Sequence, residues 1–128
     1  MPRIDREQPG AGPLVQAFSG SGFRVDGIVY SGGVKLTPRE AIAWDAPPID
    51  ELTQQAIADL LDLAPSPEFL LLGTGATLRR PARSFIDAVE ARGFGIEIMD
   101  SRAAARAWGV LRAEDRWIAA ALLPLDQG

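Results

Sequence analysis

A glycine-threonine-glycine loop, two arginines and an aspartate in the second half of the chain could form a site for a small anionic ligand. They are Gly73, Thr74, Gly75, Arg79, Arg80 and Asp100. The backbone N–H groups of a short glycine loop can bind an anion, and arginine guanidinium groups pair with carboxylates and phosphates in bidentate geometry. Since ligands of open α/β sheets gather at the carboxyl ends of strands, these residues predict a candidate ligand pocket.

A simpler structural interpretation stands beside each of these residues. A dinucleotide fingerprint would have a third glycine where Leu78 stands, and a P-loop would continue into Gly-Lys-Ser or Gly-Lys-Thr. A tight turn that needs positive φ explains the glycines without any ligand. Asp100 can be a helix N-cap, worth ~1 kcal/mol, and the arginines can form a solvated face. The residues alone leave both interpretations open.

The chain contains neither cysteine nor histidine, which excludes much catalytic and metal-binding chemistry. Without these residues there is no disulfide, no Cys or His metal site, no thiol nucleophile and no imidazole base near neutral pH. The acidic pairs Asp50/Glu51 and Asp59/Asp62 fit helix faces rather than acid–base work. We therefore expect no cofactor and no transition metal, and an enzymatic function is disfavoured.

Charge and hydropathy limit the classes of partner. The 13 basic and 17 acidic residues give a net charge of −4, and an acidic chain repels nucleic-acid phosphates. The longest mostly apolar stretch, residues 117–125, is far shorter than the ~20 residues that a membrane span needs. The N-terminus lacks the apolar segment of a secretory signal. These features predict a cytoplasmic protein with no nucleic-acid partner and no integral membrane segment.

The first third of the sequence predicts a leader followed by antiparallel strands. Residues 1–13 contain three prolines and two glycines without an apolar period, which predicts a mobile leader. From residue 14 to 44, β-forming residues are separated by Asp26-Gly27 and Ser31-Gly32-Gly33. Asp-Gly is a strong hairpin signal, so two or three antiparallel strands are predicted.

The remainder alternates helices and strands. The expected elements are a helix from its cap Asp50 to about Ala64, a buried strand at 69–72, a helix from Pro81 to Gly93, a strand at 94–98, a helix capped by Asp100 or Ser101, and a strand at 117–123. This order predicts right-handed βαβ crossovers with helices on both sheet faces. We expect a three-layered single α/β domain over residues 14–124, with a mixed, mainly five-stranded central sheet preceded by an N-terminal antiparallel hairpin. Residues 125–128 would be a short tail.

Three stretches, taken together, resemble a known family. They are GFRVDGIVY at 22–30 followed by Trp44, LLLGTG at 70–75, and IEIMDSRAAAR at 96–106 continuing to AAALLP at 119–124. In this order and spacing they resemble the domain of unknown function 498/598 family, over roughly residues 14–124. That family includes mitochondrial complex I assembly factor 3 proteins and adipogenesis-associated relatives. The resemblance implies a compact three-layer α/β fold with a five-stranded mixed sheet, and no established reaction.

The resemblance also implies a role in protein assembly. The mitochondrial branch of the family acts in respiratory complex I assembly with a partner protein at the inner membrane. A non-enzymatic assembly or adaptor protein with a protein partner is therefore the leading hypothesis. Ala105, Gly109 and Asp115 depart from the family pattern, which often has Cys, Asn and Gly there, and this argues against a shared enzymatic mechanism. The alternative is a small anionic ligand-binding protein or enzyme that uses the glycine loop and its arginines.

Residues near the C-terminus are candidates for contact with a partner. They are Trp117, Arg106, Glu114 and Arg116. A half-exposed Trp117 at a strand start could anchor a protein contact or a homo-oligomer, because aromatic residues often dominate interfaces. The charged residues match the family's Arg-then-Glu-x-Arg pattern. They fit partner recognition or an ion-pair network between the last helix and the last strand, and the residues do not decide between the two.

Overall fold

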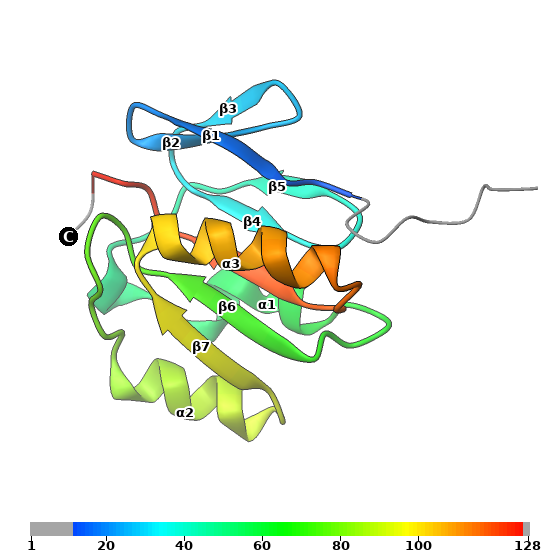
Figure 1. The fold of residues 1–128 in the computed structure, drawn as a ribbon. Helices are drawn as coiled ribbons and strands as arrows, with labels where there is room; N and C mark the ends of the chain where they lie inside the picture. The colour runs from blue at the N-terminus through cyan, green and yellow to red at the C-terminus, as the bar shows by residue number, and fades with distance from the viewer. Residues whose placement is uncertain (1–11, 127–128) are drawn as a thin grey trace, which may run out of the picture.

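Two β-sheets organise residues 12–126, the part of the chain that the computed structural model describes (Figure 1). The three-stranded antiparallel sheet, called here the meander, consists of β1 (Val15–Ser19), β2 (Gly22–Val25) and β3 (Ile28–Tyr30). The central sheet contains β4 (Val34–Leu36), β5 (Ala41–Ala43), β6 (Phe69–Gly73), β7 (Gly95–Met99) and β8 (Ala119–Leu122). Most of the leader predicted over residues 1–13, and residues 127–128 of the predicted tail, lie outside the described residues.

The central sheet is mixed, as predicted, and its strand order is β5-β4-β8-β6-β7. β6 pairs in parallel with both β7 and β8, whereas β4 pairs antiparallel with β8 and β5. The three-layered α/β fold with five central strands is therefore confirmed. Residues 14–44 contribute more strands than the two or three expected, because β4 and β5 join the central sheet after the meander.

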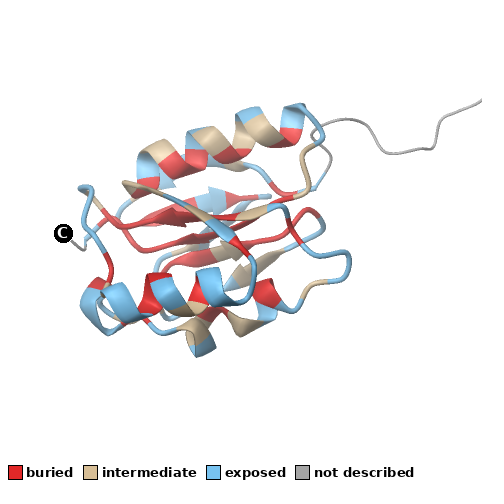
Figure 2. Cartoon of the chain, turned by 90° about the horizontal axis from the view of Figure 1, so that it is seen from below, coloured by how far each residue is buried: buried red, intermediate tan, exposed pale blue. Residues whose placement is uncertain are grey.

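Alternate residues of β6 point to opposite faces of the central sheet, and each face has its own hydrophobic core. Leu70 and Leu72 pack against the 3₁₀ turns η1 (Ile49–Glu51) and η2 (Gln54–Ile57) and the helices α1 (Ala58–Leu61) and α2 (Arg83–Ala91). Leu71 packs on the other face against α3 (Ser101–Ala113) and the meander. The buried residues accordingly form the middle of the molecule (Figure 2). A strand covered on both sides explains the continuous apolar run in the sequence.

The turn between β2 and β3 is the predicted Asp-Gly hairpin. Asp26 and Gly27 have φ angles of 51° and 82°. Positive φ at both central residues is the signature of a two-residue type I′ turn, whose twist matches that of the flanking strands. The register pairs Phe23 with Tyr30 and places buried Phe23 over the core beside α3.

The prediction of one helix from Asp50 to Ala64 is wrong. This segment forms η1, η2 and the short α1, with extended backbone at Leu52 and Thr53 between the two turns. Asp50 lies within η1 and caps no helix. The two 3₁₀ turns bury the same apolar residues that a helix would bury, so the apolar spacing of this segment does not distinguish the two structures.

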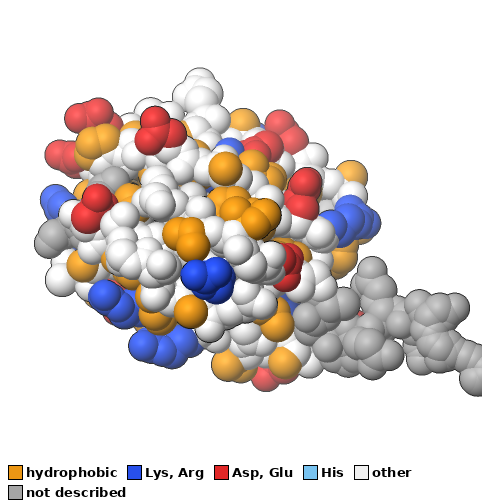
Figure 3. Space-filling model, turned by 90° about the horizontal axis from the view of Figure 1, so that it is seen from above, with side chains coloured by type: hydrophobic (Ala, Val, Ile, Leu, Met, Phe, Trp, Pro, Cys, Tyr) orange, Lys and Arg blue, Asp and Glu red, His pale blue; other side chains and the backbone are white. Residues whose placement is uncertain are grey.

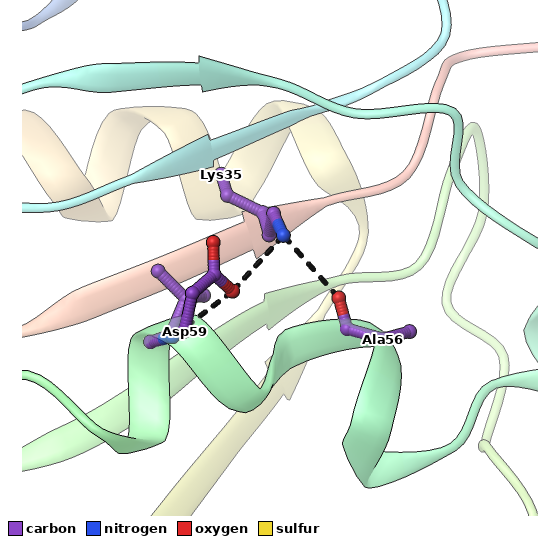
Figure 4. A network of polar contacts seen from close by, with 4 residues as sticks. Lys35, Ala56 and Asp59 are labelled. Carbon is purple, nitrogen blue, oxygen red and sulfur yellow. Dashed lines mark hydrogen bonds and ion pairs between the residues drawn. The ribbon is translucent and has the colours of Figure 1, made fainter.

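Lys35 of β4 ties this broken segment to the sheet. Its Nζ donates to the Ala56 carbonyl at 3.3 Å and to Asp59 Oδ1 at 2.9 Å (Figure 4). Its ammonium also lies 5.8 Å from the centroid of the Trp44 ring. The only lysine of the chain thus has a structural role.

The last two helices were predicted more accurately than the first. α2 begins at Arg83, two residues after Pro81, and Gly93 with φ of 90° follows its end. α3 begins after Asp100, whose Oδ1 accepts from the Ala103 N–H at 2.9 Å, so the predicted cap is confirmed. None of the helices between residues 12 and 126 combines the length and apolar character that a membrane-spanning segment requires.

Candidate functional site

The amides of the glycine loop at the end of β6 donate within the chain. The Thr74 N–H donates to the Met99 carbonyl at 2.9 Å, and the Gly75 N–H donates to Ser101 Oγ at 2.8 Å. Gly75 has a φ of 106°, which favours glycine there. These contacts explain the loop as a tight connection between β6 and α3, and they engage both amides within the chain.

Ser101 joins three distant segments at this point. Its buried hydroxyl accepts from Gly75 and donates to the Leu123 carbonyl at 2.7 Å. The approach is so close that a Cβ on Gly73 would lie 2.8 Å from Ser101 Oγ and 2.9 Å from Leu122 Cδ2. The sequence indicated Ser101 only as an alternative cap, because nothing local shows which carbonyl its hydroxyl meets.

Thr74 shapes the chain that leads to the arginines. Its side chain is buried, and its Oγ1 donates to the Thr77 carbonyl at 2.7 Å and accepts from the Arg79 N–H at 3.0 Å. Arg79 and Arg80 are both exposed. Thr74 therefore acts as a support for the arginine segment, and its hydroxyl is engaged within the chain.

Arg79 lines an open cleft of about 520 Å³ beyond the strand ends. The cleft is lined by Ser31, Gly32, Asp45, Ala46, Pro48, Arg79, Pro124 and Asp126. Of the six predicted residues only Arg79 is among its lining residues, so the cleft does not bring the predicted set together. Two carboxylates share the walls with one guanidinium, which makes the cleft mixed in charge rather than an anion pocket.

The candidate contact residues Arg116 and Trp117 are engaged within the chain. Arg116 Nη2 lies 2.7 Å from Glu68 Oε1, and the Trp117 Nε1–H donates to the Pro65 carbonyl at 2.9 Å. The Arg39 guanidinium lies 4.9 Å from the Trp117 ring centroid. The hydrogen bond from Arg116, followed by that from the Trp117 N–H, lowers the pKa of Glu68 below its ordinary value.

The other two candidate contact residues, Arg106 and Glu114, are exposed on α3 and just after it. Glu114 adds a favourable charge near Arg116, but the ion pair of Arg116 is formed with Glu68. The carboxylate partner of Arg116 is therefore Glu68, which lies just before β6 and is not part of the Arg-then-Glu-x-Arg pattern.

Arg112 is a buried polar residue that sequence reasoning missed. It is 1% exposed, and its Nη1 donates to the Arg116 carbonyl at 2.6 Å. It follows Trp108 by one helical turn, so its place on the apolar stripe of α3 was the available signal. The contact fixes the chain reversal after α3.

Several exposed hydrophobic side chains lie on the meander or just before it. They are Leu14, Phe18, Ile28 and Val29, with exposed fractions of 38, 38, 57 and 38%. Figure 3 views the molecule from this side and shows hydrophobic side chains spread over it, with basic side chains among them. Sequence reasoning missed this surface, because a strand pattern does not show which face a neighbouring element covers.

A groove runs between β1 and α3 at the margin of the meander. The β1–α3 groove has a volume of about 220 Å³ and is lined by Val15, Gln16, Ala17, Phe18, Ala105 and Arg106. The Phe18 ring meets Phe23 edge-on at 6.2 Å, and the Arg102 guanidinium lies 5.8 Å from its centroid. This groove combines apolar walls with basic side chains from one helix.

Comparison with known proteins places this geometry in context. The family described as "Protein of unknown function (DUF498/DUF598)" matches residues 15–123. The chain is 27% identical to NADH dehydrogenase [ubiquinone] 1 alpha subcomplex assembly factor 3 of Danio rerio, over 98% of this chain and 72% of the relative. It spans 62% of the length of the Homo sapiens protein of that name, at 26% identity.

Two bacterial proteins match over nearly their whole length. An uncharacterized protein of Rhodobacter capsulatus is 34% identical over 94% of this chain and 92% of its own. The solution structure of a Bordetella pertussis protein described as a Mth938-like domain has a TM-score of 0.78 at 25% identity, covering 98% of this chain and 94% of that one. The two-sheet architecture is thus shared by a solved structure.

Proposed function

The chain belongs to the DUF498/DUF598 family of proteins of unknown function, and on this premise we propose that it is a non-enzymatic assembly or adaptor protein. Its task would be to bind a protein partner during assembly of a multi-subunit complex, with an NADH dehydrogenase as the first candidate. The observation that carries the proposal is the match over 98% of this chain to a relative named as an NADH dehydrogenase assembly factor.

The distribution of polar and apolar groups supports a binding role. The predicted loop amides and the Ser101 hydroxyl hydrogen-bond within the chain, so the strand ends offer few groups for chemistry. The meander carries exposed apolar side chains beside a groove, and surfaces of this kind are used for protein contacts. An adaptor needs such a surface and needs no catalytic group.

The proposal is tested in the native cell by deleting the gene and separating membrane complexes on a native gel. We expect less assembled NADH dehydrogenase and an accumulation of its subcomplexes, both restored by the wild-type gene. Capture of the tagged chain followed by mass spectrometry should then recover subunits of the same complex. Normal amounts of the assembled enzyme in the deletion strain would contradict an assembly role.

A second function, binding of a small anionic ligand, is favoured only by the position of Arg79 in the 520 Å³ cleft. A ligand that binds the folded state alone stabilises it by ~2.7 kcal/mol at a hundredfold excess over its Kd. Sulfate or phosphate should then raise the melting temperature more in the wild type than in the Arg79→Ala/Arg80→Ala variant at equal ionic strength. Equal gains would remove this alternative, since sulfate also stabilises proteins by exclusion from their surface.

A further inference from the structure

β1 differs from the other strands at the sheet margins. Its five residues, VQAFS, carry no charge, and its outer edge has no strand partner in the sheets of residues 12–126. By contrast, the marginal strands β3 and β5 have three residues each, and β7 carries Glu97. Natural proteins usually protect exposed edges by shortness, charge or proline. β1 lacks these three protections and has only a β-bulge near Val15, so the stretch beyond the bulge suits an edge that pairs with another chain.

The neighbouring helix supplies charge complementarity for such a pairing. Arg102 and Arg106 lie one turn apart on α3, both exposed, and Arg106 lines the β1–α3 groove. Neither forms an ion pair with a carboxylate among the described residues. The Arg102 guanidinium lies over the Phe18 ring, and Arg106 lines the groove together with Phe18, so an apolar side chain has two arginines beside it. Aromatic and arginine residues in this combination are enriched at binding hot spots.

We propose that β1 and the β1–α3 groove bind an extended segment of a partner protein that combines an apolar residue with acidic ones. The segment pairs with the outer edge of β1 along Ala17–Ser19, beyond the β-bulge near Val15. Its apolar side chain lies beside Phe18 and its carboxylate beside Arg106. This inference rests on the proposed adaptor function and adds the chemistry of the partner.

An extended segment fits better than a second copy of this chain. An added strand gains main-chain hydrogen bonds at the edge, and its alternate side chains fall into pockets such as the groove. A symmetric pair would bring the same patch of both copies together, so the arginines of one copy would meet those of the other. Like charges across a contact are unfavourable, whereas an acidic segment neutralises them.

The test uses a display library of short random peptides selected on the full-length wild-type chain. We expect enriched peptides that contain an apolar residue flanked by Asp or Glu. The strongest should bind Phe18→Asp about tenfold more weakly or worse, since a hot-spot loss exceeds ~1.4 kcal/mol. Leu78→Asp, at an exposed apolar position in the chain after β6 and outside the groove lining, is the matched control and should bind normally.

A charge reversal at Arg106 distinguishes specific recognition of acidic peptides from non-specific hydrophobic binding. Selection on Arg106→Glu should enrich basic peptides in place of acidic ones. Arg83→Glu makes the same charge change on α2, where Arg83 is exposed, and should leave the acidic preference unchanged. Melting curves of each variant confirm folding. Identical enrichment on wild type and Arg106→Glu, or no enrichment on either, would overturn the proposal.

The strand pairing itself is tested with N-methylated copies of a selected peptide. Methylation of alternate amides removes edge hydrogen bonds and keeps the side chains, so binding should be lost for one set of alternate positions and kept for the other. Protection from hydrogen exchange should appear within residues 17–19 on binding. Equal binding by both methylated sets would exclude a strand addition. A concentration-dependent dimer that Phe18→Asp dissociates would assign the groove to a second copy and likewise overturn the proposal.

Separate outcomes test the groove and the adaptor function. If Phe18→Asp and Arg106→Glu restore complex assembly in the deletion strain as well as the wild type does, the groove is not the assembly surface and the adaptor function stands. If the deletion strain has no assembly defect, the adaptor function fails. Peptide selection then still reports whether the groove binds acidic segments.

Discussion

Removing the Ser101 hydroxyl, the only side-chain oxygen on α3, should clearly destabilise the fold. The hydroxyl accepts from the Gly75 N–H and donates to the Leu123 carbonyl, at 2.8 and 2.7 Å. In Ser101→Ala both backbone groups lose their partner at a position that is 0% exposed. Both losses occur where β6, α3 and the end of β8 meet.

The expected magnitude follows from the two orphaned groups. A buried donor or acceptor left without a partner costs about 1–3 kcal/mol. The two losses share one site and are not fully additive, so we expect ~2–4 kcal/mol in total. At roughly 4 °C per kcal/mol for a domain of this size, the melting temperature should fall by about 8–16 °C. The better helix propensity of alanine offsets only a few tenths of a kcal/mol.

Urea unfolding followed by circular dichroism measures this difference through the midpoint at constant slope. The control is Ser84→Ala, an exposed serine on α2, which should change stability by less than about 0.5 kcal/mol. If Ser101→Ala loses no more than this control, the hydroxyl does not hold the three segments together. The structural interpretation of the glycine loop would then be refuted.

Two further changes test the neighbouring contacts. Gly73→Ala should lower the free energy of unfolding by ~1–3 kcal/mol in the same urea assay, because the new Cβ would lie 2.8 Å from Ser101 Oγ. The control is Gly109→Ala, where a Cβ meets nothing within 4 Å, and this change should stabilise α3. Equal effects of the two changes would contradict the close approach at Gly73. Glu68→Gln should destabilise the protein near neutral pH, because Arg116 lowers the pKa of Glu68 in the folded state. This stabilisation is present above the ordinary pKa of about 4.5 and is lost as pH falls through the lowered value. The difference in melting temperature between wild type and Glu68→Gln should therefore vanish in acid. A difference that stays constant with pH would exclude the ion pair as its cause.

Local signals in the sequence predicted the parts of the fold that local interactions determine. α3 was predicted from Asp100 and the apolar stripe through Trp108, and both act over one helical turn. The Asp26-Gly27 turn likewise depends on two residues alone. The helix predicted from residue 50 to 64 does not form, because 3₁₀ turns satisfy the same apolar spacing. Lys35, from a distant strand, hydrogen-bonds to the second turn and to α1.

The candidate site was predicted less well because its geometry comes from residues far apart in the chain. Ser101 meets Gly75 and Leu123 only after the βαβ crossovers have brought the strand ends together. The Glu68–Arg116 pair joins the segments just before β6 and β8, which the strand order makes neighbours. The β1–α3 groove exists because the meander lies over the same sheet face as α3, and no local pattern specifies that placement.

The energetics of hydrogen bonding favour partner binding at β1 over ligand binding at the glycine loop. A ligand that used the Thr74 and Gly75 amides would first have to break their bonds to Met99 and Ser101. Each broken bond leaves a buried group that costs about 1–3 kcal/mol. A segment that pairs with β1 breaks no bond between strands, because the outer edge of β1 faces no other strand among the described residues. Its apolar side chains also cover Phe18, which is already 38% exposed, so both contributions to binding are gains.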